Sequence, residues 1–206
     1  MRWGATDEEV AGPFPGADLV PDGERGATMA VTIDATPEQV WPWLVQMGWD
    51  RAGFYSWDLL DNAGRPSARE VHPEWQDLAV GDRLKCLGVD SYAVAALEPN
   101  RFLGLYWLSD LRGHLLDPAQ PRPSAYMEGY WGFRLTELSG GRTRLLIAGY
   151  QAARPRWFEE IQYGWVFPAL VWFMQARMLA VLKRNIGAAR TPAQLATAEQ
   201  RAGVAV

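Results

Sequence analysis

The chain has 206 residues, of which 49% are hydrophobic, so it can form one domain with a sizeable core and no cross-links. Its formal net charge of −4 and its scattered arginines exclude the basic surface of a nucleic-acid-binding protein. The single cysteine, Cys86, excludes an internal disulfide, and the N-terminal MRWGATDEEV lacks a signal-peptide pattern, so we expect a cytoplasmic protein.

The first 26 residues are rich in glycine, proline and acidic side chains, which predicts an irregular arm. We expect Trp3 and Phe14 to anchor this N-terminal arm (residues 1–26) to the rest of the chain. The segment ATMAVTIDA, at 27–35, has the apolar and β-branched residues of a strand. The domain proper is therefore expected to begin at residue 27.

Two short helices are expected after this strand. The sequence TPEQ, at 36–39, predicts a helix start, because threonine caps, proline suits the first helical position and glutamine completes a capping box. Gly48 is the expected stop, and Pro42 removes one hydrogen bond, which indicates a short or kinked helix. The second helix is predicted within 56–64 and ends at Gly64.

From Asp82 onward the sequence becomes strand-like, with a break at Pro99-Asn100. The clearest hairpin signal is Ser139-Gly140-Gly141, which joins two long apolar segments. Strands are expected at 82–88, 91–100, 101–108, 126–138 and 141–151.

The C-terminal part is predicted to be helical. A short helix is expected at 157–165, and Pro168 suits the first turn of a long helix that ends near Ile186. Residues 188–206 have few large apolar side chains, so we expect a flexible or weakly helical tail. The apolar face of the long helix comprises Val171, Met174, Met178, Val181, Leu182 and Ile186.

The order of these elements indicates the fold class. Strands that follow one another, rather than alternate with helices, indicate an α+β fold with an antiparallel sheet. The long helix must lie against that sheet to bury its apolar face. The predicted domain covers residues 27–187.

Several separated motifs occur in an order that we can compare with a known superfamily. They are TPEQVWPWLVQMG, GFYSWDLLDNAGRPSA, VHPEWQDLAVGD, GFRLTELSGGRTRLLI and MLAVLKRN. In these motifs the chain resembles the START-like SRPBCC superfamily of helix-grip proteins, in the branch of polyketide cyclase/dehydrase and lipid-transport-like proteins. The resemblance covers roughly residues 1–187. It implies a curved antiparallel sheet gripping a long C-terminal helix, with a cavity between them for apolar small molecules.

Common catalytic and cofactor motifs are absent from the sequence. There is no G-x-S-x-G elbow, Walker loop, G-x-G-x-x-G or H-E-x-x-H. His72, His114 and Cys86 are too few and too far apart to form a zinc site. We therefore expect no metal and no cofactor.

If the protein is an enzyme, Tyr55, Asp58 and Glu128 are the candidates for proton transfer. The alternative for Asp58 is a structural role, either as a cap of the short helix or as a partner of a tryptophan N–H. Strand periodicity places Trp131 and Phe133 on one face of their strand and Glu128 on the other.

The four tryptophans of WPWLVQMGWDRAGFYSWD, residues 41–58, pose the question of core or cavity wall. We expect Trp41 and Trp43 to pack a helix onto the sheet, and Tyr55 and Trp57 to border a cavity. Gln175 lies within the apolar helix face, where it could orient a ligand or bond to the protein. The expected ligand-binding residues are Tyr55, Trp57, Trp107, Trp131, Phe133, Val171, Met174, Gln175, Met178 and Leu182.

These observations leave three hypotheses. The first is a non-catalytic binder of an apolar or aromatic small molecule, as ligand pockets are mostly apolar. The second is a cyclase- or dehydratase-type enzyme that folds a polyketide-like chain. In the third, Trp165, Val166 and Trp172 form a homodimer or membrane contact, unless the N-terminal arm covers them. The apolar stretch 161–176 is shorter than the roughly 20 residues of a membrane span, so a spanning helix is not expected.

Overall fold

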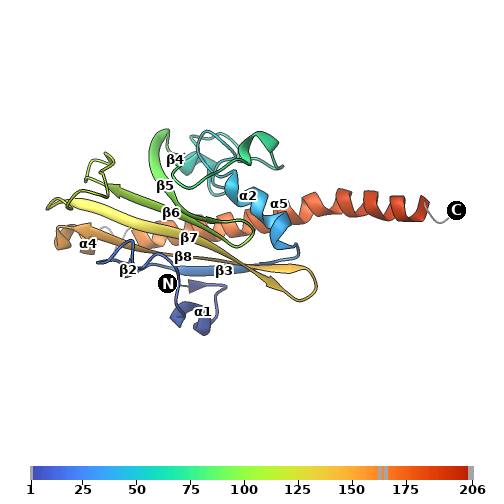
Figure 1. The fold of residues 1–206 in the computed structure, drawn as a ribbon, viewed down its shortest axis with the longest axis horizontal. Coiled ribbons are helices and arrows are strands. Elements are labelled where there is room, and N and C mark those ends of the chain that lie inside the picture. Colours follow the sequence, from blue (N-terminus) through green and yellow to red (C-terminus); the bar gives the residue numbers. More distant parts are fainter. Residues whose placement is uncertain (1, 162–163, 165–166, 204–206) are drawn as a thin grey trace.

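The computed structural model describes residues 2–161, 164 and 167–203, which form one large curved sheet and one long helix (Figure 1). The described strands pair in the order β1-β3-β8-β7-β6-β5-β4, with β2 beside β8. β1 is parallel to β3, and the other pairs are antiparallel. The strands are β1 (Arg2–Trp3), β2 (Glu24–Arg25), β3 (Thr28–Ile33), β4 (Arg83–Cys86), β5 (Val89–Glu98), β6 (Phe102–Ser109), β7 (Tyr126–Leu138) and β8 (Arg142–Arg154).

The long helix, α5, lies along one face of the sheet, as the predicted α+β helix-grip architecture requires (Figure 1). Its end was predicted too early, because it continues beyond Ile186 and past the end of the sheet. The tail residues include many Ala, the residue with the highest helix propensity, which favours continuation of the helix. The helices are α1 (Asp7–Ala11), α2 (Pro37–Val45), α3 (Asp58–Asp61), the 3₁₀ helix η1 (Pro73–Trp75), α4 (Arg156–Ile161) and α5 (Phe167–Gly203).

Helix α2 starts as its sequence predicts. Pro37 is its first residue, and the Thr36 N–H donates a 3.1 Å hydrogen bond to Oε1 of Gln39. This bond satisfies a backbone donor that the helix itself cannot pair. The helix ends at Val45, before the predicted stop, and buries Trp43 against the sheet.

The β7–β8 hairpin is also where the sequence places it. Its strands pair without interruption from Tyr126 opposite Arg154 to Leu138 opposite Arg142. Gly140 and Gly141 form the turn with φ angles of 81° and 65°, which glycine adopts without a Cβ penalty.

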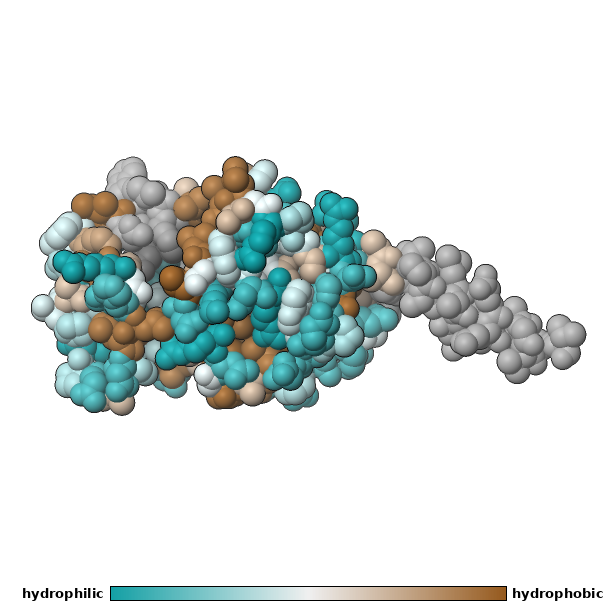
Figure 2. Space-filling model, turned by 90° about the horizontal axis from the view of Figure 1, so that it is seen from above, coloured by the Kyte–Doolittle hydropathy of each residue, from teal (hydrophilic) through white to brown (hydrophobic). Residues whose placement is uncertain are grey.

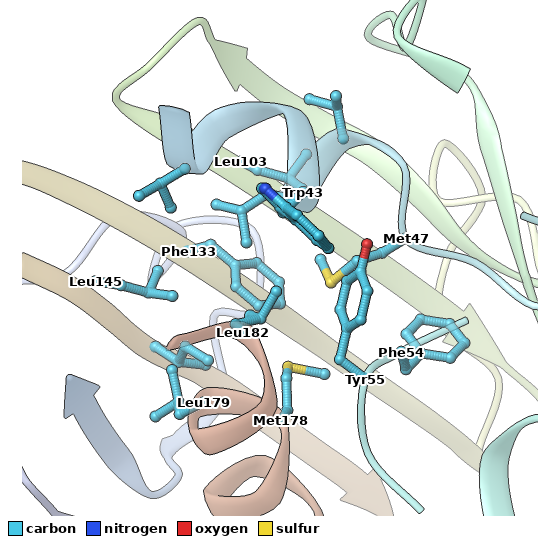
Figure 3. Close-up of a cluster of buried hydrophobic side chains, with 14 of the residues drawn as sticks. Trp43, Met47, Phe54, Tyr55, Leu103, Phe133, Leu145, Met178, Leu179 and Leu182 are labelled. Carbon is cyan, nitrogen blue, oxygen red and sulfur yellow. The ribbon is translucent and has the colours of Figure 1, made fainter. Parts of the chain in front are cut away.

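The main core lies between the sheet, α2 and α5. Figure 3 shows Trp43 of α2, Phe133 of β7 and Leu182 of α5 pointing toward one another. All three side chains are buried. Close packing of these side chains fixes the position of α5 on the sheet. The N-terminal part of α5 is thereby held above the sheet as well.

The other face of the sheet is covered by the N-terminal arm. Phe14 is buried there and meets Phe102 edge-on, with 5.9 Å between ring centroids. The arm is less irregular than predicted, since it contains β1, α1 and β2. A charged pair fastens it, because Glu9 accepts hydrogen bonds of 2.8 and 2.7 Å from Arg144 of β8.

We expect Arg144→Ala to lower the free energy of unfolding by about 1–3 kcal/mol, the range for hydrogen bonds to a charged partner. The guanidinium also donates to the carbonyl of Gly4, so its loss removes contacts of β8 with α1 and with the segment before it. Chemical denaturation would measure the change. Arg142→Ala, at an exposed position on the same strand, is the matched control, and an equal loss in both variants would contradict this role.

Candidate functional site

A cavity of about 510 Å³ lies between the sheet and the first turns of α5. The segment 54–56, α3 and the strands β4 to β8 form its other walls. Most of its surface is apolar, and the larger lining side chains are Phe54, Tyr92, Trp107, Met127, Trp131, Val171, Met174 and Met178.

One face of helix α5 contributes side chains to both the core and the cavity, from different parts of its length. Leu179, Leu182 and Ile186 are fully buried in the core. One to two turns earlier, Val171 and Met174 are half-buried and line the cavity instead. The predicted apolar face therefore changes role at Met178, which is buried and also lines the cavity.

Aromatic rings form one wall of the cavity. Tyr92 of β5 contacts Trp107 edge-on at 5.5 Å between ring centroids and lies 6.1 Å from Trp131. Phe54 lies 6.4 Å from both Trp131 and Tyr92, measured between ring centroids. The neighbouring strands β5, β6 and β7 supply Tyr92, Trp107 and Trp131 on one face of the sheet, because alternate residues of each strand point to the same face.

The cavity reaches the surface between the β4–β5 turn and the start of α5. Leu87 and Val89 on the turn line the cavity, yet they are 58% and 60% exposed. Leu170 of α5 also lines the cavity, and 43% of its surface is exposed. Figure 2, which looks from the side where β4 and β5 lie in Figure 1, shows apolar patches bordered by hydrophilic side chains.

The only acidic side chain among the described lining residues is Asp61, the last residue of α3. It is 4% exposed, and neither carboxylate oxygen has a hydrogen-bond partner within the described chain. Burial, together with the nearby Asp58, raises the pKa of Asp61 to about 6. The hydroxyl of Ser56 opposes this increase in part, although it donates its own hydrogen bond to the Met174 carbonyl at 3.1 Å.

Hydrogen bonds within the segment 56–67 hold Asp61 at the cavity. Asp58 accepts from the backbone N–H and the hydroxyl of Ser67, at 3.0 and 2.6 Å. Gly64 donates to the Asp58 carbonyl at 2.7 Å and has a φ of 78°, which suits glycine. These bonds join Asp58, the first residue of α3, to the segment after the helix, so Asp61 is placed by the loop and not by partners of its own carboxylate.

Two further polar atoms on the cavity side chains lack partners in the described chain. They are the indole Nε1 of Trp131, a donor, and the amide Oε1 of Gln175, an acceptor. A buried polar group without a hydrogen bond costs about 1–3 kcal/mol. With the two oxygens of Asp61, the residues that line the cavity carry one donor and three acceptors without a partner in the described chain.

Cys86 also lines the cavity, and the reactivity of its thiol depends on the charge of Asp61. Burial and then the Asp61 carboxylate raise the pKa of the Cys86 thiol, while the Tyr92 hydroxyl opposes the increase. Asp61→Asn should lower this pKa, because the neutral amide no longer disfavours a thiolate. We expect iodoacetamide to alkylate Cys86 about two- to tenfold faster at pH 8 in this variant, since the thiolate is the reacting form. An unchanged pH–rate profile would contradict the placement of Asp61 beside Cys86.

The structure gathers part of the sequence-predicted ligand set around the cavity. Phe133 and Leu182 lie in the core and are absent from the lining. Trp57 lies outside it, stacked on Phe173 at 4.9 Å with the Arg177 guanidinium over its ring at 4.1 Å. The predicted residues that line the cavity are Trp107, Trp131, Val171, Met174, Gln175 and Met178.

Tyr55 lies in the core, apart from the cavity that we expected it to border. Its side chain is fully buried, and its hydroxyl accepts a 2.7 Å hydrogen bond from Gln46. Its φ of 57° is uncommon for a residue with a Cβ. This backbone turn directs Tyr55 into the core while its neighbours Phe54 and Ser56 line the cavity.

The other two candidates for proton transfer also lie outside the cavity lining. Asp58 binds Ser67, as described above, which is a structural role other than the two we considered. Glu128 is buried on the opposite face of the sheet, where Tyr106 and Arg122 donate to its carboxylate. The cavity carboxylate is Asp61, which sequence reasoning missed in favour of its neighbour three residues earlier.

The remaining expectations concern metals and interfaces. No cluster of three potential metal ligands occurs among the described residues, and no helix within them is long and apolar enough to cross a membrane. Trp165 and Val166 lie outside the described residues. Trp172 is half-buried, and its Nε1 donates to the carbonyl of Arg2 in the N-terminal arm at 3.3 Å.

Comparisons with known proteins find similarity only at the level of three-dimensional structure. A hypothetical protein from Helicobacter pylori has a TM-score of 0.49 and 15% identity, over 78% of this chain and 86% of its own. CalU16 from Micromonospora echinospora has a TM-score of 0.35 and 16% identity, over 81% and 93%. A protein from Mesorhizobium loti has a TM-score of 0.38 and 22% identity, over 80% and 98%. No family model matches the chain, and no curated protein sequence matches it.

Proposed function

We propose that this protein reversibly binds an apolar small molecule with an aromatic or polyketide-like body. The observation that carries this proposal is the cavity itself, which is open at one side, walled by aromatic and methionine side chains, and supplied with unpartnered polar atoms. Small-molecule sites commonly combine a mainly apolar wall with a few polar groups that orient the ligand.

The size of the cavity supports this assignment. Its volume of about 510 Å³ lies within the range of roughly 300–1,000 Å³ that is typical of ligand pockets. Met127 lines the cavity from β7, and Met174 and Met178 line it from α5. Their flexible side chains can adapt to ligands of different shape. The unpartnered atoms of Asp61, Trp131 and Gln175 would then orient the bound molecule.

Native mass spectrometry of the protein as purified, followed by denaturing extraction, tests the proposal. We expect an apolar passenger or the uptake of apolar aromatic compounds added to the purified protein. Met174→Trp should reduce binding by filling the cavity, whereas Ala180→Trp, at an exposed position of the same helix, should not. The absence of binding to a panel of lipids, polyketides and aromatic dyes would contradict the proposal.

A second candidate is cyclase- or dehydratase-type catalysis on a polyketide-like chain, and Asp61 is the observation that favours it. A carboxyl with a pKa of about 6 inside an apolar cavity can accept and return protons near neutral pH. Product analysis after incubation with poly-β-keto compounds tests this role. Product formation that depends on protein and disappears in Asp61→Asn supports catalysis, and turnover that is unchanged in this variant contradicts it.

A further inference from the structure

The charge of Asp61 carries an inference about the ligand, which rests on the proposed binding function. We propose that the ligand carries a protonated amine, which pairs with the Asp61 carboxylate inside the cavity. The protein would thus bind apolar cations in preference to neutral compounds or to carboxylates such as fatty acids.

The first argument is the lack of a positively charged partner for Asp61 within the cavity. Among the described residues that line the cavity, none is Lys, Arg or His. Asp61 is only 4% exposed, and neither of its carboxylate oxygens has a hydrogen-bond partner in the described chain. A buried charge is usually paired, because isolation from water without compensation is costly. The missing partner is a hydrogen-bond donor with positive charge.

The surrounding groups leave the potential at Asp61 negative. Asp58 of the same helix adds a second negative charge, and the raised pKa of Cys86 on β4 keeps that thiol neutral near pH 7. On the α5 side, Arg177 binds the carbonyl of Ser56 at 2.8 Å and lies over the ring of Trp57. A ligand cation would therefore meet an attractive field, and a ligand carboxylate would meet a repulsive one.

The aromatic wall suits the same ligand. Trp131 and Tyr92 both line the cavity, and the faces of aromatic rings attract cations. An amine can donate several hydrogen bonds, so the Gln175 amide oxygen offers it a second acceptor. Both features favour an amine attached to an aromatic or otherwise apolar body.

Three naphthalene compounds that differ in one group test this inference. They are 2-naphthylmethylamine, 2-naphthylmethanol and 2-naphthoate, and calorimetry would measure their affinities. We expect the amine to bind about ten- to a hundredfold more tightly than the other two at pH 8, as a charge-assisted hydrogen bond implies. Its affinity should fall as the pH drops from 8 to 5, because Asp61 then gains a proton while the amine stays charged.

Asp61→Asn preserves the shape of the side chain and removes its charge. We expect this variant to lose the preference for the amine and its pH dependence, while 2-naphthylmethanol still binds. Asp34→Asn, an exposed change of equal charge, should retain both properties. Equal binding of the three compounds, or an amine preference that survives in Asp61→Asn, overturns the inference and leaves the binding function standing. Failure of all three compounds to bind also overturns the inference, and the panel of lipids, polyketides and aromatic dyes then decides the binding function.

Discussion

Phe133→Ala is expected to lower the free energy of unfolding by about 3–5 kcal/mol, as is usual when a buried aromatic side chain is truncated. Phe133 is completely buried between α2, α5 and the sheet (Figure 3). Its ring packs against Trp131, with 4.6 Å between ring centroids, on the same face of β7. Removal of the ring leaves a hole in the core that rigid neighbours cannot fill.

Trp131→Ala supplies the matched comparison, two residues earlier on the same strand. Trp131 lines the cavity and its indole N–H has no partner in the described chain, so we expect a smaller loss of stability and a large loss of ligand binding. Denaturant titration and ligand calorimetry on both variants would separate the two roles. An equal loss of stability in Phe133→Ala and Trp131→Ala would contradict the division between core and cavity wall.

Asp61→Asn is expected to stabilise the protein at pH 8, by as much as about 3 kcal/mol, and to have little effect near pH 4. The pKa of Asp61 is raised from 3.8 to about 6 in the folded protein. Between these values the folded state keeps a proton that the unfolded state has lost, so stability falls as pH rises. Above pH 6 the buried charge of Asp61 lowers the free energy of unfolding by its full amount. The neutral amide in Asp61→Asn carries no such charge, so the substitution removes this loss.

Chemical denaturation of the two proteins from pH 4 to pH 8 would measure this difference, because contributions from other ionisable groups cancel in the comparison. The exposed control Asp34→Asn should show no such pH-dependent gain. A destabilised Asp61→Asn at pH 8 would indicate that the carboxylate has a structural partner. A gain in stability in Asp61→Asn would instead indicate that Asp61 lowers the stability of the fold and is retained for its role in the cavity.

Local signals in the sequence predicted much of the fold. The capping residues of α2 and the glycines of the β7–β8 turn each satisfy a backbone requirement that can be read from a few neighbouring residues. Strand periodicity also placed Trp131 and Phe133 on the face opposite Glu128 correctly. The grouping of strands before one long helix was enough to indicate the α+β fold class.

The cavity residues depend on long-range packing, which local patterns do not contain. Trp131 and Phe133 share one face, and only the position of α5 makes the first a cavity residue and the second a core residue. The left-handed backbone of Tyr55 turns its side chain into the core, and no local pattern in the sequence indicates this conformation. Asp58 and Asp61 are equivalent in sequence, and the contacts with Ser67 distinguish them.

The most direct test of the binding function is the rate at which iodoacetamide alkylates Cys86, the only cysteine, with and without 2-naphthylmethylamine. Cys86 lines the cavity, so a ligand bound there should block access to the thiol. We expect saturating ligand to slow alkylation at least about tenfold in the native protein, with no such protection in Met174→Trp. Ligand that binds by calorimetry but leaves the alkylation rate unchanged would place the binding site elsewhere and contradict the account.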